Sequence, residues 1–249
     1  MGEQVILEGH ISVSAALRSG NRPIQIIYAQ RNVADEALQS LASLARAAGV
    51  KIQLVGNDRI EAYATGRSHG GIIALAGPRR MLALEELLGK QGAPFIVMVD
   101  GVEDPFNFGA AIRSLYAAGA DGLVVRPRNW TSAGIVARAS AGASELIPTA
   151  LARTPHEAAA FFRQRGLLIA CATHHNNAAS LYTADLSVPL FLLIGGEKRG
   201  ITRSFVERAD LHLSIPYTRT DAHSLGAAAA TSIIAFEIMR QRRQERARG

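Results

Sequence analysis

Three short segments combine polar side chains with glycines in spacings that suit ligand binding or the orientation of a reacting group. The first runs from Asp100 to Arg113 and contains Asn107 and Gly109. An asparagine here can cap the free amides of a helix, and a glycine lets the backbone approach a neighbour closely. An arginine in the first turns of a helix can hold a phosphate through two parallel hydrogen bonds. Taken alone, these residues fit equally a capped helix with a solvated arginine.

The second segment, residues 193–200, carries an apolar strand into a glycine-rich loop. Gly195 and Gly196 are followed by the carboxylate of Glu197 and then by Gly200. Backbone amides in such a loop can cradle a ligand. The alternative is a helix N-terminus with a favourably placed carboxylate.

The third segment joins the end of an apolar strand to a helix that begins with small residues. Ile215 and Pro216 end the strand, and Ser224, Leu225 and Gly226 lead into a run of alanines. Such a helix start permits close packing, so we expect a ligand or another subunit to lie against it.

Common signatures of other chemistry are absent from the sequence. It contains neither the dinucleotide fingerprint, nor a P-loop, nor a nucleophile elbow. Cys171 is the only cysteine, which excludes an internal disulfide and a cysteine-based metal cage. His174 and His175 follow a strand end, but no third ligand is evident, so we expect a polar loop and no metal.

Composition and charge are those of an ordinary globular chain with a basic C-terminal end. The 249 residues are 48% hydrophobic and carry a net charge of +6. No apolar run approaches the roughly 20 residues that span a bilayer, and residues 1–9 do not resemble a signal peptide. A cytoplasmic location is the default expectation. The five arginines at positions 240, 242, 243, 246 and 248 indicate either contact with a polyanion or a solvated helix end.

Alternating strands and helices predict two α/β regions. The first has helices at 12–18 and 35–48, the latter ended by Gly49, and strands at 25–29, 51–55 and 71–76. A boundary follows at residues 78–93, where a short helix is expected at 82–88. The second region has strands at 95–102, 123–125, 167–172, 190–194 and 211–215, separated by helices at 108–118, 132–143, 155–165 and 224–243. Near-continuous apolar strands of this kind predict a parallel sheet covered on both faces.

Read together, the three segments resemble, in order and spacing, the motifs of the SpoU/TrmH family of RNA ribose 2′-O-methyltransferases in the SPOUT superfamily. Residues 138–143 resemble the family's small-residue segment. Residues 8–17 and 69–74 resemble the N-terminal RNA-binding domain of many members, which is similar to a small ribosomal-protein fold. The resemblance covers nearly the whole chain, and its motifs are Asn107-x-Gly109-x-x-x-Arg113, Gly196-Glu197-x-x-Gly200, and Ile215-Pro216 followed by Ser224-Leu225.

The resemblance implies an architecture and a chemistry. It implies an RNA substrate-binding domain at 1–77, a linker at 78–93, and a methyltransferase domain at 94–249 whose parallel sheet contains a deep trefoil knot. The implied cofactor is S-adenosylmethionine, and the implied partners are RNA, with ribosomal RNA favoured over transfer RNA, and a second copy of the chain in a homodimer.

The resemblance also assigns roles to particular residues. Arg113 matches the family's essential arginine, and we expect it to bind the substrate phosphate and orient the hydroxyl, because an arginine stays protonated. Asn107 and Glu197 match residues that position that arginine or the substrate, and Ser224 matches the serine of the third motif. The expected cofactor-binding residues are Thr173, Gly195, Gly196, Ile215 and Leu225.

The third motif departs from the family pattern. The family has Ser-Leu-Asn-Val-Ser where this chain has Ser224-Leu225-Gly226-Ala227-Ala228. Two alternatives therefore stay open beside an active methyltransferase. One is an RNA-binding member with a weak or inactive site, and the other is an unrelated α/β enzyme acting on small molecules.

Overall fold

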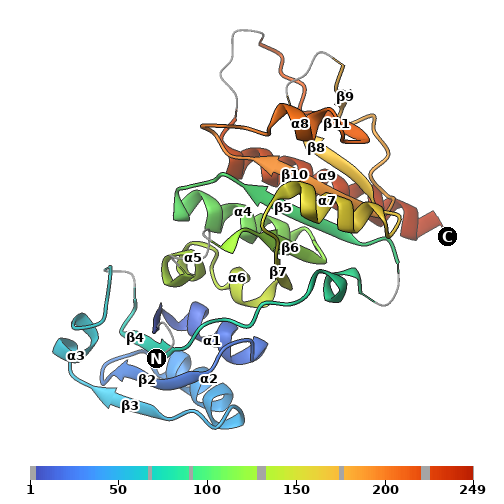
Figure 1. Ribbon diagram of the computed structural model, residues 1–249. Coiled ribbons are helices and arrows are strands. Elements are labelled where there is room, and N and C mark those ends of the chain that lie inside the picture. Colours follow the sequence, from blue (N-terminus) through green and yellow to red (C-terminus); the bar gives the residue numbers. More distant parts are fainter. Residues whose placement is uncertain are drawn as a thin grey trace. The chain divides into compact units, whose positions relative to one another are not determined.

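The computed structural model describes residues 4–66, 69–89, 92–127, 133–173, 177–219 and 225–248 (Figure 1). The chain forms two compact units. The first comprises Met1–Met81 together with Ser132–Leu146, and the second comprises Leu82–Thr131 together with Ile147–Gly249. Residues 132–146, which the sequence assigned to the second domain, thus belong to the first compact unit. The functional division at 1–77, 78–93 and 94–249 stays a prediction.

The first unit is built on a mixed sheet with helices packed against it. Among the described residues its strand order is β1-β4-β2-β3, with β4 antiparallel to both its neighbours and β3 parallel to β2. The strand at residues 5–8 was not predicted, because four residues carry little periodicity. The elements are β1 (Val5–Glu8), α1 (His10–Ser19), β2 (Ile24–Gln30), α2 (Asp35–Ala47), β3 (Ile52–Val55), α3 (Asn57–Glu61) and β4 (Ile72–Ala76).

The small-residue segment after residue 132 does not form the one continuous helix that we predicted. It forms α5 (Ala133–Ala139) and α6 (Ala143–Leu146), and the backbone turns between them at Ala141 and Gly142, both with positive φ. A Cβ added to Gly142 would lie 2.6 Å from the Cβ of Ala15 on α1. Small residues are therefore required here by close packing within the first unit.

A buried ion pair also ties this segment to the first unit. The guanidinium of Arg22 donates to both carboxylate oxygens of Glu145, at 2.8 and 2.9 Å, and both side chains are fully buried. On α5, Arg138 pairs with Glu8 at the end of β1. A buried carboxylate and guanidinium are stable only when paired, so these contacts fix α5 and α6 to the unit.

The second unit contains the predicted parallel sheet. Within the described residues it has seven strands in the order β7-β6-β5-β10-β8-β11-β9, and every neighbouring pair is parallel. The prediction of an α/β fold with a parallel sheet is confirmed. The strands are β5 (Phe95–Asp100), β6 (Gly122–Val125), β7 (Thr149–Leu151), β8 (Leu168–Ala172), β9 (Ala179–Ser180), β10 (Leu190–Gly195) and β11 (Leu211–Ser214).

Helices cover both faces of this sheet (Figure 1). On one face α4 (Pro105–Ala117) packs along α9 (Ala227–Arg248), and the hydroxyls of Ser114 and Ser232 meet at 2.7 Å. On the other face α7 (Pro155–Arg163) buries Phe162 against Phe191 of β10, with ring centroids 5.1 Å apart. The remaining helix of the described chain is α8 (Arg203–Val206).

Two helix predictions in this unit need correction. The segment at 82–88 forms a 3-10 turn, η1 (Leu84–Leu88), and not an α-helix. The final helix begins at Ala227 and extends to Arg248, whereas the sequence suggested 224–243. Within the described ranges, no helix is both long and apolar enough to cross a membrane.

Candidate active site

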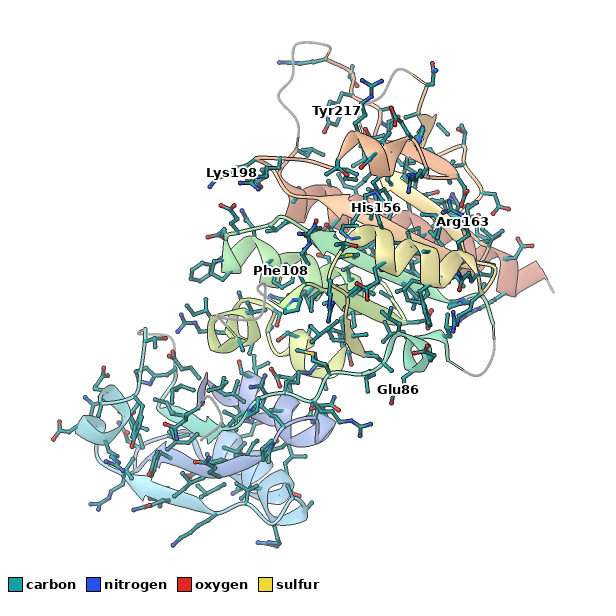
Figure 2. The ribbon with its side chains drawn as sticks, viewed as in Figure 1. Glu86, Phe108, His156, Arg163, Lys198 and Tyr217 are labelled. Atoms are coloured by element: carbon teal, nitrogen blue, oxygen red, sulfur yellow. The ribbon has the colours of Figure 1, made fainter. Side chains whose placement is uncertain are left out.

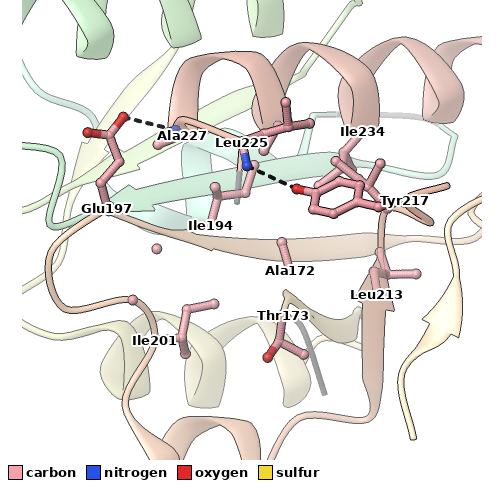
Figure 3. Close-up of a pocket in the computed structure, with 15 residues that line it drawn as sticks. Ala172, Thr173, Ile194, Glu197, Ile201, Leu213, Tyr217, Leu225, Ala227 and Ile234 are labelled. Carbon is pink, nitrogen blue, oxygen red and sulfur yellow. Dashed lines mark hydrogen bonds between the residues drawn. The ribbon is translucent and has the colours of Figure 1, made fainter. Parts of the chain in front are cut away.

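A cavity of the second unit lies at the carboxyl ends of β8, β10 and β11, where ligands of parallel α/β sheets commonly bind. Its volume is about 230 Å³, and Figure 3 shows the residues that line it. The loops that follow β8, β10 and β11 each contribute residues to its lining. The lining residues are Ala172, Thr173, Ile194, Gly195, Gly196, Glu197, Gly200, Ile201, Leu213, Ile215, Tyr217, Leu225, Ala227, Ala230 and Ile234.

All the residues predicted to bind the cofactor meet at this cavity. Thr173 follows β8, Gly195 ends β10 and Gly196 follows it, Ile215 follows β11, and Leu225 precedes α9. These residues span more than 50 positions of sequence, yet they line one space. The structure shows that these residues lie together, which the sequence does not show directly. Their role in cofactor binding stays a prediction.

The glycines of the loop after β10 are required by close backbone contacts. A Cβ on Gly195 would lie 2.6 Å from the carbonyl carbon of Gly200, and a Cβ on Gly196 would lie 2.0 Å from the Gly101 oxygen. The amide of Gly196 donates to the Asp100 oxygen at 2.7 Å. The loop is therefore held against the end of β5, and no side chain fits at either glycine.

Sequence reasoning missed the apolar walls of the cavity and one polar group. The hydroxyl of Tyr217 accepts a hydrogen bond from the Leu225 amide at 3.0 Å (Figure 3). That bond joins the loop after β11 to the segment before α9. Ile201 and Leu213 contribute apolar surface. The available signal was that Tyr217 lies two residues after the predicted strand end at 215, because the carboxyl ends of parallel strands lie at the same side of the sheet.

A second cavity, of about 120 Å³, adjoins the first at Glu197. Figure 2 labels Lys198, which lies on the loop after β10. The Lys198 ammonium pairs with the Glu103 carboxylate at 2.7 Å. That partner raises the pKa of Lys198. The lining residues are Gly101, Val102, Glu103, Asp104, Asn107, Glu197 and Lys198.

The helix α4 begins one turn earlier than the asparagine that we expected to cap it. The side chain of Asp104 accepts from the Asn107 amide at 2.7 Å, and Pro105 occupies the first helical turn. The prediction that Asn107 caps this helix is wrong, because Asp104 already fills that role. Asn107 instead lies in the first turn of the helix and lines the second cavity beside Glu197.

The structure does not bring Arg113 to these cavities. It is exposed on α4, and it is absent from the described lining of both. Six helical residues rotate the chain by about 240° and advance it by about 9 Å, so Arg113 and Asn107 point in different directions. Ser224, His174 and His175 lie outside the described residues.

The Glu197 carboxylate contacts the start of α9. Its Oε1 accepts from the Ala227 amide at 3.3 Å (Figure 3). Glu197 is thus the one described side chain that lines both cavities, because it extends from the loop after β10 across to the last helix. A carboxylate at this place can accept a hydrogen bond from a hydroxyl bound between the two cavities.

The first cavity has the chemistry of a site for an adenosine-like ligand. Ile194, Ile201 and Leu213 supply apolar surface for a flat ring, while Thr173 and backbone groups supply polar contacts. The glycines at 195 and 196 let the loop after β10 pack closely against Gly200 and Gly101 at the side of this cavity. Among described residues, no three histidine, cysteine or carboxylate side chains lie close enough together to hold a metal ion.

Two family models match the chain and together cover most of it. Residues 94–236 match the SpoU rRNA Methylase family, and residues 6–82 match the RNA 2′-O ribose methyltransferase substrate-binding domain. A curated relative from Ralstonia nicotianae, the 23S rRNA (guanosine-2′-O-)-methyltransferase RlmB, is 36% identical over 97% of this chain and 98% of its own. The RlmB protein of Shewanella oneidensis is 34% identical over 98% and 100%.

A solved structure agrees with these sequence matches. The AdoMet-bound rRNA methyltransferase of Sinorhizobium meliloti is 26% identical and superposes with a TM-score of 0.79, covering 95% of this chain and 87% of that protein. The motifs, the parallel sheet and the cavity where the predicted cofactor residues meet all fit this group, and the chain belongs to the SpoU rRNA methylase family.

Proposed function

We propose that this chain transfers a methyl group from S-adenosylmethionine to the 2′-hydroxyl of a guanosine in 23S ribosomal RNA. The observation that carries the proposal is the convergence of Thr173, Gly195, Gly196, Ile215 and Leu225 on one cavity. The choice of guanosine in 23S RNA rests on the relatives named RlmB. As a SpoU family member, the chain is an RNA methyltransferase that uses S-adenosylmethionine.

The two cavities suggest how the reaction partners are oriented. S-adenosylmethionine supplies a methyl group activated by its sulfonium charge: its S–C bond breaks as the ribose O–C bond forms, S-adenosylhomocysteine leaves, and the hydroxyl proton passes to solvent. The apolar residues of the first cavity hold the adenosine part, and the second cavity receives the acceptor ribose. Glu197 then accepts a hydrogen bond from the ribose 2′-hydroxyl, while Asn107 offers an amide to the same nucleotide. Holding the hydroxyl in line with the methyl group is the main contribution of these side chains.

Arg113 acts, in this proposal, on the RNA backbone. Its guanidinium is exposed on α4, where a phosphate of the bound RNA can reach it without desolvating a buried charge. Large aromatic side chains are exposed on α4 and on the neighbouring helix α9. Phe106 and Tyr116 of α4 are 56% and 44% accessible, and Phe236 of α9 is 43% accessible. Exposed aromatic surface of this kind favours a homodimer formed through α4 and α9, which would bring a second copy close to Arg113.

The wider setting follows from the same proposal. The N-terminal domain at 1–77 binds the ribosomal RNA, the residues at 78–93 link it to the methyltransferase domain at 94–249, and the latter contains the trefoil knot. The protein works in the cytoplasm, where ribosomal RNA is modified. The alternative of an RNA-binding member with an inactive site rests on Gly226 and Ala228, and it predicts RNA binding without transfer.

A labelled-methyl assay tests the proposal. Purified protein is incubated with S-adenosylmethionine carrying a labelled methyl group and with 23S RNA from cells that lack the enzyme. We expect label in the RNA, and we expect Arg113→Ala to lower the rate by about 100-fold while cofactor binding is kept. Arg208→Ala, which removes another exposed arginine of the second unit, is the matched control. Transfer to transfer RNA alone, or equal rates for Arg113→Ala and wild type, contradicts the proposal.

A further inference from the structure

The space beside Gly226 is occupied by another residue's carboxylate. Among described atoms, a Cβ added to Gly226 would have only the Glu197 side chain within 4 Å, with Oε1 at 2.9 Å and Cδ at 3.9 Å. The backbone of Gly226 does not adopt the left-handed conformation. A side chain at position 226 would therefore have to displace this carboxylate, whereas the local backbone geometry does not demand a glycine.

The carboxylate has a reason to stay in that space. Oε1 of Glu197 accepts from the Ala227 amide at 3.3 Å, at the start of the 22-residue helix α9. The free amides and the dipole of a helix N-terminus favour a negative charge. The loop that carries Glu197 is itself fixed, because the Gly196 amide bonds to Asp100 and the Gly200 amide bonds to the Gly196 oxygen at 2.9 Å.

We propose that Gly226 is a positioning residue, whose missing side chain lets the N-terminus of α9 hold the Glu197 carboxylate between the two cavities. The inference rests on the proposed function, in which that carboxylate accepts the hydrogen bond of the acceptor hydroxyl. The departure from the family's third motif is then a compensated change. The space of the absent asparagine side chain is filled by Glu197, so the site keeps a polar group at the same place.

Restoring a side chain at this position therefore harms the site. In Gly226→Ala the new Cβ displaces the flexible end of Glu197 by several tenths of an ångström, and in Gly226→Asn the longer side chain competes for the Ala227 amide. We expect each variant to lower kcat by about tenfold, and KM for S-adenosylmethionine to change by less than about twofold. If Gly226 had only a structural role, its substitution would change kcat and the KM for S-adenosylmethionine together.

A double-mutant cycle with Glu197→Ala separates positioning from a general effect on the helix. We expect Gly226→Ala to lower kcat by about tenfold in the wild-type background, and by less than about twofold when residue 197 is already alanine. An equal loss in both backgrounds overturns the proposal. The matched control is Gly56→Ala, because Gly56 precedes α3 with an ordinary φ of −77, and no described residue other than its chain neighbours comes within 4 Å of its added Cβ.

Amide hydrogen exchange supplies a readout that needs no turnover. The Ala227 amide is protected by its bond to Glu197, so we expect faster exchange in Glu197→Ala and in Gly226→Ala, and no change in Gly56→Ala. Unchanged exchange in Gly226→Ala overturns the positioning role. If wild type shows this protection but transfers no methyl group to RNA, the proposed function fails while the contact stands, so the two failures are distinguishable.

Discussion

The two ends of α9 are fixed in different ways. Its N-terminus lies at the carboxyl ends of the sheet's strands, and its C-terminal part lies at their amino ends. At its N-terminus the Ala227 amide makes one 3.3 Å bond to Glu197, beyond the carboxyl end of β10. Near its C-terminus Arg242 donates to the backbone oxygens of Ala93, Pro94, Leu186 and Val188, just before β5 and β10 begin. Among the described residues, the Ala227 amide has this one contact to an exposed side chain, whereas Arg242 alone has four contacts to backbone oxygens.

We infer from this difference that the N-terminus of α9 contributes to the candidate active site, and that its C-terminal part contributes to the stability of the fold. Arg242 is half-buried, lies 5.4 Å from the ring centre of Phe95, and has its pKa lowered by burial. Its guanidinium bonds to the oxygens of Ala93, Leu186 and Val188, and more weakly to the Pro94 oxygen, which also accepts from the Leu190 amide at 2.8 Å. Glu197 is exposed and lines two cavities. We therefore expect substitutions at the two ends to affect different measurements.

The largest expected effect is on turnover, at the N-terminal end. Glu197→Gln keeps the size of the side chain but removes its charge, so the acceptor hydroxyl loses its strongest hydrogen-bond partner. We expect kcat for methyl transfer to fall by about 100-fold, with a change in unfolding free energy below about 1 kcal/mol. Single-turnover rates and urea unfolding measure the two quantities. If Glu197→Gln instead lowered the free energy of unfolding strongly and left kcat normal, the assignment of this helix end to turnover would be contradicted.

The next effect is on stability, at the C-terminal end. Arg242→Ala leaves four carbonyl oxygens without this donor, so we expect the free energy of unfolding to fall by about 2–3 kcal/mol. Turnover per folded molecule should stay close to wild type. The control is Arg243→Ala, one residue further on and exposed, where we expect a change below about 0.5 kcal/mol. Similar losses in both variants would mean that the carbonyl contacts contribute little.

A smaller effect concerns the two exposed arginines of the same helix end. Arg243 and Arg246 are exposed, unlike Arg242, so they are available to RNA phosphates. We expect the double change Arg243→Ala with Arg246→Ala to reduce the slope of log binding constant against log salt by about 1–2. Filter binding or fluorescence titration at several salt concentrations measures the slope. An unchanged slope would favour a merely solvated helix end.

The last effect concerns the pH dependence of stability and a residue of β8. Cys171 of β8 is buried, and burial raises its pKa to about 11. The unfolded thiol ionises at a pH of about 8.5, so the folded state binds more protons above that pH and its stability falls as the pH rises toward 11. We expect this slope to vanish in Cys171→Ala, as measured by urea unfolding at several pH values. A native thiol that reacts with iodoacetamide at pH 8 as fast as the unfolded one would contradict this burial.

Much of the second unit could be predicted because its strands are long and apolar. The runs at 95–100, 168–172 and 190–195 are buried on both faces, and they are the central strands of the sheet. The loops at their carboxyl ends carried the glycines and polar residues of the motifs. Parallel strands end at one edge, so motifs that are far apart in sequence had to meet. The cavity-lining residues at 173, 195, 196, 215 and 225 follow from that rule.

The features that could not be predicted depend on contacts between distant segments. The break at Ala141 and Gly142 is required by packing on α1, which no local pattern records. Asp104 and Asn107 are both good capping residues, and only the backbone path decided between them. Gly226 looked like a loss in the third motif, because its sequence neighbours give no sign that Glu197 fills the space beside it.

The most direct test of the central claim is a map of ribose methylation across 23S RNA from wild-type cells and from cells lacking this gene. We predict one guanosine whose 2′-O-methyl group disappears in the deletion strain. Adding back the wild-type gene should restore the methyl group, and adding back the Arg113→Ala form should not. Identical maps from the two strains, or a lost methyl group on transfer RNA alone, would contradict the account.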